Sequence, residues 1–243
     1  MAVSHKNRVV HLRSLTEEVI EANLEGWSAT IRDDLLAAAA WSSDSRQVLL
    51  FSEMQLYASV WSLVEQAAVA RLESPKLLPP KGMDFSANGQ FMALVQKGGV
   101  EGKTLISILY ASHDWKLTNQ FEVAEMHDVQ DCKWILRSTA ILVQDSALEC
   151  QFAVYSAMTG AKIAHHRPDS NLGLGIRTIS VSPSASLLVC SVYDSAIHIY
   201  NNLTQQYVGQ LDHCSTITID PKSQQSQPDI FKEELIRNEG GRA

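Results

Sequence analysis

Residues 85–94, Phe-Ser-Ala-Asn-Gly-Gln-Phe-Met-Ala-Leu, combine a large apolar residue, a polar turn and the start of an apolar run. Asn88 and Gly89 both tolerate the left-handed backbone conformation that a tight hairpin turn requires. The run that follows, from Gln90 to Gln96, has the length of a β-strand. This stretch therefore predicts a β-hairpin.

The same arrangement recurs along the chain, which is the signature of a repeat architecture. The residues that open each copy, spaced by 44, 49 and 47 positions, are Trp41, Phe85, Trp134 and Val181. The aromatic residues that close each copy, spaced by 49, 45 and 45 positions, are Trp61, Tyr110, Tyr155 and Tyr200. Residues 11–15 have the same phase as residues 59–63, so we expect the sequence to start partway through a copy.

Units of this length with four short apolar runs are typical of the blades of a β-propeller. A helical repeat array would need apolar residues every three to four positions, and only residues 17–24 and 228–237 could form helices. The sequence therefore predicts an all-β propeller with about four complete four-stranded blades and a partial N-terminal blade, with ring closure left open. The expected boundaries are a partial blade at 1–24, blades at 25–72, 73–125, 126–167 and 168–214, and a linker with a short helical or disordered tail at 215–243.

Composition excludes several classes of protein. The 243 residues include 20 Lys and Arg against 27 Asp and Glu, a net charge of −7 that disfavours general binding to nucleic acid. No apolar run is long enough to span a membrane, so we expect a cytoplasmic protein without a membrane partner. The four cysteines are far apart, which favours reduced, buried thiols over a disulfide framework.

Motifs that carry chemistry are weak. Residues 97–104 resemble a phosphate-binding loop, but the pattern needs glycine at position 97, which is lysine, and a strand follows in place of a helix. His165 and His166 would point to opposite faces of a strand, with no further ligand at metal-binding spacing. No Gly-x-Ser-x-Gly elbow is present. We therefore expect no catalytic residue, no metal, no cofactor and no enzyme activity.

Four stretches resemble the WD-repeat family in a degenerate form, and more narrowly its branch at spindle poles and centriolar satellites. They are residues 85–94, 112–117, 174–184 and 193–201. This resemblance implies a non-enzymatic scaffold at the centrosome, spindle pole or basal body. It also implies a coiled-coil satellite protein as partner, and a minus-end-directed kinesin as a further partner in microtubule anchoring. The alternative is another WD-repeat adaptor, such as an RNA-processing or ubiquitin-ligase substrate module.

In a propeller, the connections between blades and the loops between second and third strands emerge on one face. The cations that these segments carry are Lys76, Lys81, Lys97, Lys103 and Arg167. We expect them to attract an acidic partner segment, although loops that are merely solvated are the simpler interpretation. Trp115 lies outside the repeat anchors, so a partly exposed role in partner binding is considered for it as well.

Overall fold

The structure is a computed structural model that describes residues 2–6, 9–13, 28–32, 36–98, 102–169, 174–193 and 196–212. The chain divides into two compact units, Met1–Leu211 and Asp212–Ala243. In the second unit only Asp212, the last residue of a strand, is described. The candidate helices at 17–24 and 228–237, Trp27 and the expected tail at 215–243 lie outside the described residues.

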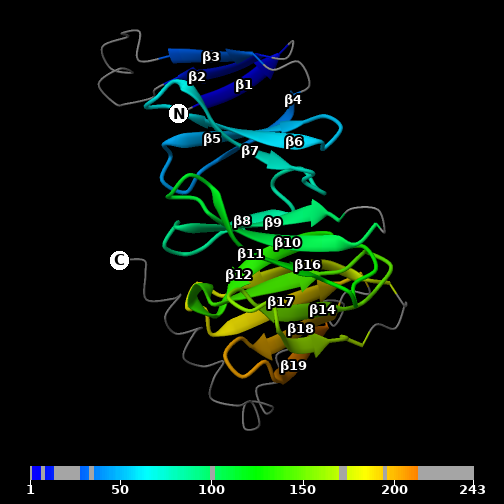
Figure 1. Cartoon of the computed structure of the whole chain (residues 1–243). Helices are drawn as coiled ribbons and strands as arrows, with labels where there is room; N and C mark the ends of the chain where they lie inside the picture. The colour runs from blue at the N-terminus through cyan, green and yellow to red at the C-terminus, as the bar shows by residue number, and fades with distance from the viewer. Residues whose placement is uncertain are drawn as a thin grey trace, which may run out of the picture. The chain divides into compact units, whose positions relative to one another are not determined.

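The first unit consists of antiparallel sheets that follow one another in chain order (Figure 1). The incomplete first sheet contains β1 (Ala2–Lys6), β2 (Val9–Arg13) and β3 (Ser28–Arg32). The first four-stranded sheet contains β4 (Leu36–Trp41), β5 (Gln47–Ser52), β6 (Tyr57–Ser62) and β7 (Ala67–Glu73). The second contains β8 (Met83–Phe85), β9 (Phe91–Lys97), β10 (Thr104–Tyr110) and β11 (Lys116–Glu122).

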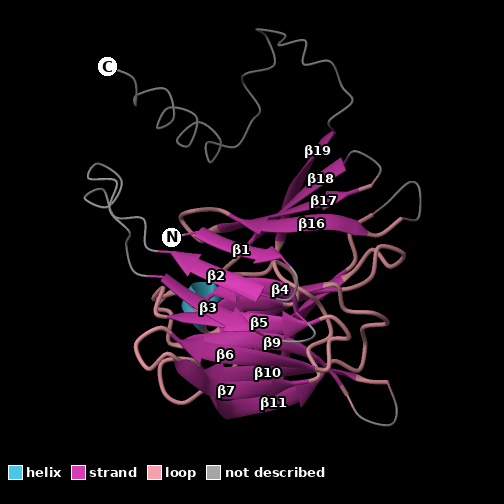
Figure 2. Cartoon of the chain, turned by 90° about the horizontal axis from the view of Figure 1, so that it is seen from above, coloured by secondary structure: helices cyan, strands magenta, loops and turns pink. Residues whose placement is uncertain are grey.

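Two further four-stranded sheets complete the described part. The third contains β12 (Asp131–Ile135), β13 (Ala140–Gln144), β14 (Phe152–Ser156) and β15 (Lys162–His166). The fourth contains β16 (Ile176–Val181), β17 (Leu187–Val192), β18 (Ala196–Asn201) and β19 (Tyr207–Asp212). One short 3₁₀ turn, Leu136–Ser138, is the helix in the described residues (Figure 2). The four four-stranded sheets confirm the predicted all-β class with blade-like repeats.

One strand lies outside the blade in which we placed it. Ser28–Arg32 was expected within the blade at 25–72. In the structure β3 pairs with β2 in the register Val9↔Arg32, so it is an edge strand of the first sheet. The pairing of β2 with β3 repeats that of β6 with β7, which agrees with the matched phase of residues 11–15 and 59–63. Among the described strands, no backbone pairing joins the first sheet to the last.

Apolar side chains fill the space between neighbouring sheets. Met92 and Leu94 of β9 pack against Leu49 and Phe51 of β5, and the other face of β9 packs against the third sheet. A third cluster, which includes Phe152 and Leu188, joins the third sheet to the fourth. Alternate residues of each central strand therefore face alternate neighbours, which explains why these strands are apolar on both faces.

Serine fixes the turn between the first and second strands in three of the four complete sheets. The hydroxyl groups of Ser42, Ser86 and Ser182 accept hydrogen bonds from backbone N–H groups five residues later, at 2.9, 2.9 and 3.0 Å. In the second sheet Ser86 also donates to Asn88 Oδ1 at 2.7 Å, and Gly89 has a φ of +69°. The predicted turn at Asn88-Gly89 is confirmed.

A β-bulge recurs between the third and fourth strands of the first three complete sheets. The extra residues are Val69, Thr118 and Ile163, because the partners of the third strand skip these positions. A bulge changes which face of the strand a side chain occupies. In β15, Lys162 lies opposite Tyr155 and His165 lies opposite Ala153, so the bulge places Lys162 and His165 on the same face.

Candidate protein-interaction surface

The antiparallel order of the strands sorts the loops onto two ends of the sheets. Loops between second and third strands lie at the same end as the connections from one sheet to the next, and we call this end the connection rim. Its segments, with the gaps given above, are 53–56, 74–82, 98–103, 123–130, 145–151, 167–175 and 193–195. The opposite end, which we call the turn rim, carries the remaining turns.

Two of the cations that we predicted on the connection rim are already paired. Lys76 Nζ lies 2.7 Å from Asp128 Oδ1 and donates a hydrogen bond to Thr104 Oγ1 at 3.0 Å, with only 17% of its side chain exposed. Lys103 Nζ lies 3.3 Å from Glu122 Oε1. These contacts neutralise both lysines, so the rim is not the row of free cations that the sequence suggested.

The other three predicted cations are exposed on the connection rim. They are Lys81, Lys97 and Arg167. Arg167 donates from Nε to Gln151 Oε1 at 3.1 Å, which links the connection after β15 to the loop before β14.

Trp115 is a core residue, and the expectation of partial exposure was wrong. Its side chain is 4% exposed and packs in the cluster between the first and second complete sheets. The indole N–H donates to Gln47 Oε1 at 2.8 Å, and the ring meets Phe85 edge to face. The left-handed backbone at Asp114 and Trp115, with φ of +53° at both, turns the side chain inward at the turn rim.

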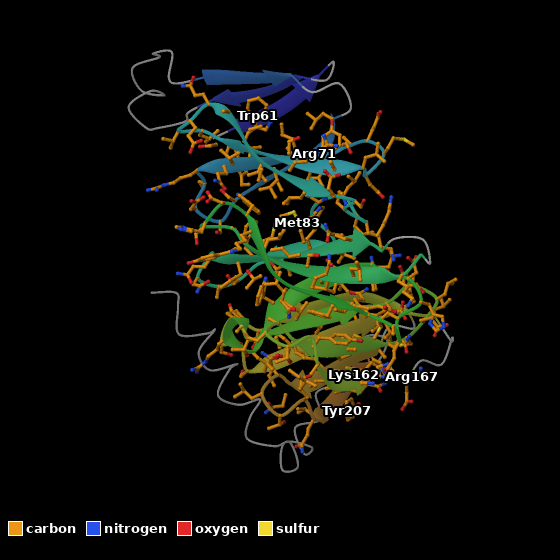
Figure 3. The ribbon with its side chains drawn as sticks, in the orientation of Figure 1. Trp61, Arg71, Met83, Lys162, Arg167 and Tyr207 are labelled. Atoms are coloured by element: carbon orange, nitrogen blue, oxygen red, sulfur yellow. The ribbon has the colours of Figure 1, made fainter. Side chains whose placement is uncertain are left out.

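Two side chains of β15 approach Glu125, which lies in the connection between β11 and β12. Lys162 Nζ lies 2.5 and 2.6 Å from the two carboxylate oxygens of Glu125, and His165 Nδ1 lies 3.7 Å from Oε2. The hydrogen bond from Lys162, with the nearby positive charge, lowers the pKa of Glu125. We call Glu125, Gln151, Lys162, His165 and Arg167 the Glu125 cluster; Figure 3 shows Lys162 and Arg167 at the third complete sheet.

Gln151 binds the side chains of both Arg167 and His165 in this cluster. Its amide nitrogen donates to Asp145 and to the carbonyl oxygen of Glu125, so Oε1 is the acceptor that faces Arg167 and His165. His165 therefore donates from Nε2, at 3.1 Å, and presents Nδ1 to Glu125. Burial, with the Arg167 charge, lowers the pKa of His165, which keeps the imidazole neutral at pH 7.

Asp145 fixes the two segments that carry the Glu125 cluster. Its fully buried carboxylate accepts hydrogen bonds from the backbone N–H groups of His127, Asp128 and Ser146 at 3.0, 2.8 and 2.8 Å. Burial raises the pKa of Asp145, but these bonds and the one from Gln151 outweigh that effect and lower it overall. The loop 145–151 and the connection 123–130 are therefore held together by one ionised acid.

Apolar side chains are exposed on both rims. On the connection rim they are Met54, Leu56, Leu148, Leu174 and Tyr193. On the turn rim they are Val64, Met158 and Leu203. Loops of a rigid scaffold that expose single apolar side chains beside charged ones are typical of surfaces for protein partners.

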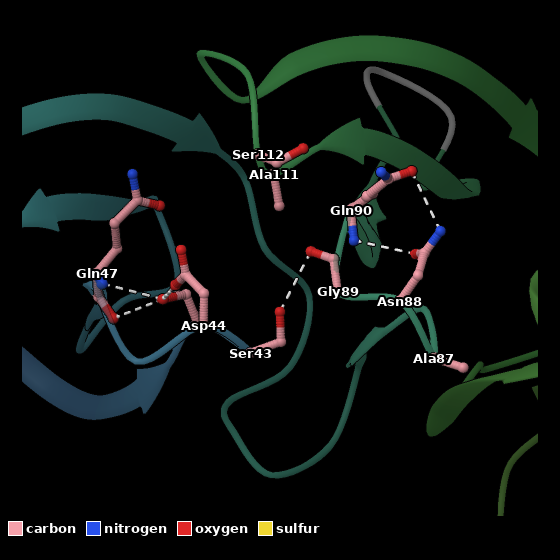
Figure 4. Close-up of a pocket in the computed structure, with 10 residues that line it drawn as sticks. Ser43, Asp44, Gln47, Ala87, Asn88, Gly89, Gln90, Ala111 and Ser112 are labelled. Atoms are coloured by element: carbon pink, nitrogen blue, oxygen red, sulfur yellow. Dashed lines mark hydrogen bonds between the residues drawn. The ribbon is translucent and has the colours of Figure 1, made fainter.

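A polar pocket of about 280 Å³ lies on the turn rim between the first turns of the first and second complete sheets (Figure 4). Ser43 donates to the carbonyl oxygen of Gly89 at 3.2 Å across it. Asp44, its one acidic residue, already accepts hydrogen bonds from Ser42 and from the N–H of Arg46. The pocket is thus a gap between turns whose polar groups bind one another.

Comparison with known proteins finds two similar WD repeat-containing proteins. No protein-family model matches the chain. Over 191 residues, or 77% of the chain, it is 28% identical to the WD repeat-containing protein WRAP73 of Mus musculus. Over 187 residues, or 76% of the chain, it is 25% identical to the uncharacterized WD repeat-containing protein C32H8.09 of Schizosaccharomyces pombe. The chain is therefore similar to WD-repeat proteins over about three quarters of its length.

WD-repeat proteins generally serve as protein-interaction scaffolds. The chain spans 39% and 38% of the lengths of the two relatives. In the part of the chain that the structure describes, no three His, Cys, Asp or Glu side chains are grouped as a metal site would need. A search of the same residues finds no helix long and apolar enough to cross a membrane.

Sequence reasoning missed four members of the Glu125 cluster: Glu125, Gln151, Lys162 and His165. Strict alternation along β15 would put Lys162 and His165 on opposite faces, because they are three residues apart. The bulge at Ile163 reverses this, and no residue type marks it. Adjacent His165 and His166 do face opposite sides, as predicted: His165 faces Glu125, whereas His166 packs between Phe152 and Tyr200.

Proposed function

We propose that this WD-repeat chain is a non-enzymatic adaptor of the spindle pole and centrosome. In this proposal it binds a coiled-coil satellite protein, and through that complex it helps to anchor microtubules together with a minus-end-directed kinesin. The proposal is supported by the resemblance of residues 85–94 and 174–184 to the spindle-pole branch of the family. The repeated four-stranded sheets support the scaffold role, because each sheet adds loops to the same rim.

The connection rim is the surface that we propose for the partner. It combines exposed cations, Lys81, Lys97 and Arg167, with exposed apolar side chains such as Leu148 and Tyr193. Lys76 and Lys103 contribute indirectly, since their ion pairs with Asp128 and Glu122 hold neighbouring segments of the rim in place. Trp115 is left out of this surface because it is buried.

The location is tested by imaging the fluorescently tagged chain in dividing cells beside a spindle-pole marker. We expect signal at the poles in mitosis and at the centrosome or basal body between divisions. Diffuse signal, or signal confined to the nucleus or to sites of protein degradation, would contradict the spindle-pole role and favour an RNA-processing or ubiquitin-ligase adaptor.

The binding surface is tested separately with a purified coiled-coil protein of centriolar satellites. We expect the double variant K81E/K97E to bind it several-fold more weakly than the native chain, because charge reversal on a rim changes the association rate. A double variant at exposed turn-rim residues, V64S/M158S, is the matched control and should bind normally. Equal binding by all three proteins would show that the connection rim is not the partner surface.

A further inference from the structure

The Glu125 cluster has the features of an anion-binding site that the carboxylate of Glu125, a residue of the same chain, already occupies. Glu125 comes from the connection between β11 and β12, whereas Lys162, His165 and Arg167 come from β15 and the segment after it. The carboxylate of Glu125 therefore comes from a segment separate from the one that carries the cations, as a partner's carboxylate would. About half of its side chain is exposed, and 39% of that of Lys162.

An exposed ion pair of this kind is easily replaced. Surface pairs contribute little to stability because water and salt screen them, so another anion can compete with Glu125 at small cost. Arg167 and His165 stay in place when Glu125 leaves, because Gln151 holds both of them through Oε1 and is itself anchored to buried Asp145. The site is therefore built before an external anion arrives.

The charges favour an anion over any other ligand. Lys162 and Arg167 are two exposed cations beside the exposed carboxylate of Glu125. The other carboxylate whose charge acts on His165 is that of Asp145. Asp145 is buried, and both of its oxygens accept hydrogen bonds from the protein. Removing Glu125 leaves an excess of positive charge on a chain whose net charge is −7.

The surroundings favour a protein segment over a free ion. β15 pairs with β14 and forms the edge of the third complete sheet, so its outer backbone groups face no strand of that sheet. Edge strands accept extended segments by strand addition. The bulge residue Ile163 is half exposed on this edge, and Leu148 is exposed on the adjoining loop, which gives apolar contacts beside the cations.

We infer that the Glu125 cluster binds an anionic side chain, a carboxylate or a phosphate, of an extended partner segment, and that Glu125 occupies this site until the partner displaces it. This inference rests on the proposed scaffold function and specifies the chemical group that the partner contributes to one contact. The partner's anion takes the place of the Glu125 carboxylate between Lys162 and Arg167. Its neighbouring apolar residues lie against Ile163 and Leu148.

The test measures fluorescence anisotropy with three labelled peptides of equal length, one rich in glutamate, one with a single phosphoserine and one with glutamine in place of glutamate. We expect the first two to bind the native chain and the glutamine peptide not to bind. The variant E125Q should bind the anionic peptides about two- to five-fold more tightly, the factor expected when an exposed ion-pair competitor is removed. The peptide that gains more identifies carboxylate or phosphate as the natural group.

The variant K162E/R167E should lose binding at least ten-fold. The variant R46E/K116E is its control, because it changes the net charge equally at two exposed residues of the turn rim. Circular dichroism with thermal unfolding verifies that each variant is folded. Equal losses in both double variants, or no gain in E125Q, would overturn the inference. If K162E/R167E captures the coiled-coil protein as well as the native chain does while K81E/K97E does not, the inference fails and the proposed scaffold function stands.

Discussion

Trp134 binds Asp84 twice, although the two residues are 50 positions apart. The backbone N–H of Trp134 donates to Asp84 Oδ2 at 2.7 Å, and its indole N–H donates to the carbonyl oxygen of Asp84 at 3.0 Å. Asp84 Oδ1 also accepts the N–H of Phe85 at 3.0 Å. These bonds join β8 to β12, the first strands of the second and third complete sheets.

Replacing this acid therefore tests how the sheets hold together. We expect Asp84→Ala to lower the free energy of unfolding by about 1–3 kcal/mol, because the partly buried backbone N–H groups of Phe85 and Trp134 lose their acceptor. Burial raises the pKa of Asp84, so its charge is costly in the fold, and Asp84→Asn should cost less than Asp84→Ala. Urea unfolding followed by tryptophan fluorescence measures both, and equal stability of the Ala variant and the native chain would contradict the bridging role.

Asp145 should make the fold sensitive to acid. Its pKa is lowered in the folded state, so its contribution is fully present above the ordinary carboxyl pKa of 3.8 and is lost as the pH falls through the folded value. We expect Asp145→Asn to be less stable than the native chain at pH 7 and to converge with it below pH 3.8. Urea midpoints measured from pH 7 to pH 3 decide this, and a difference that stays constant over the whole range would rule out an ionised Asp145.

His166 should add a second loss of stability at a higher pH. Its ring packs against Phe152 and Tyr200, with centroids 4.7 and 4.8 Å away, and burial lowers its pKa below the ordinary value of 6.5. The lowered pKa means that protonation favours the unfolded chain, so stability is full above pH 6.5 and falls as the pH drops toward the folded value.

We expect His166→Phe to keep the packing and to reduce this pH dependence. The pKa of His165 is lowered as well, so His165→Gln should remove a separate part of the slope and the double variant should remove both parts. The thermal midpoint between pH 7.5 and pH 5 is the measurement. An unchanged native slope in the Phe variant would assign the titration to another group.

Repeat spacing was sufficient to predict the sheets, because the same apolar anchors recur in each. Trp41, Trp61 and Trp134 pack against the clusters between or beside sheets, as anchors should. The charged contacts could not be predicted from the sequence, because they depend on the course of the connections and on the position of a β-bulge. Lys76 meets Asp128 across two connections, and Lys162 meets Glu125 only because of the bulge at Ile163.

The close approach of the connection 167–175 to the loop 145–151 can be tested at a single glycine. In the structure the N–H of Gly175 donates to the carbonyl oxygen of Ala147 at 2.7 Å, and an added Cβ would lie 2.5 Å from the carbonyl carbon of that residue. Backbone cannot move aside as a flexible side chain can, so Gly175→Ala should lower the free energy of unfolding by about 1–3 kcal/mol.

Gly209 in β19 is the matched control, since a Cβ there meets no atom within 4 Å and the residue lies in a strand. Gly209→Ala should leave stability unchanged or raise it slightly, because alanine restricts the unfolded chain. Gly175→Ala should in addition weaken binding at the Glu125 cluster, since Ala147 and Gln151 belong to the same loop. Equal stability of the two alanine variants would mean that residues 174–175 do not pack against residues 146–147 in solution.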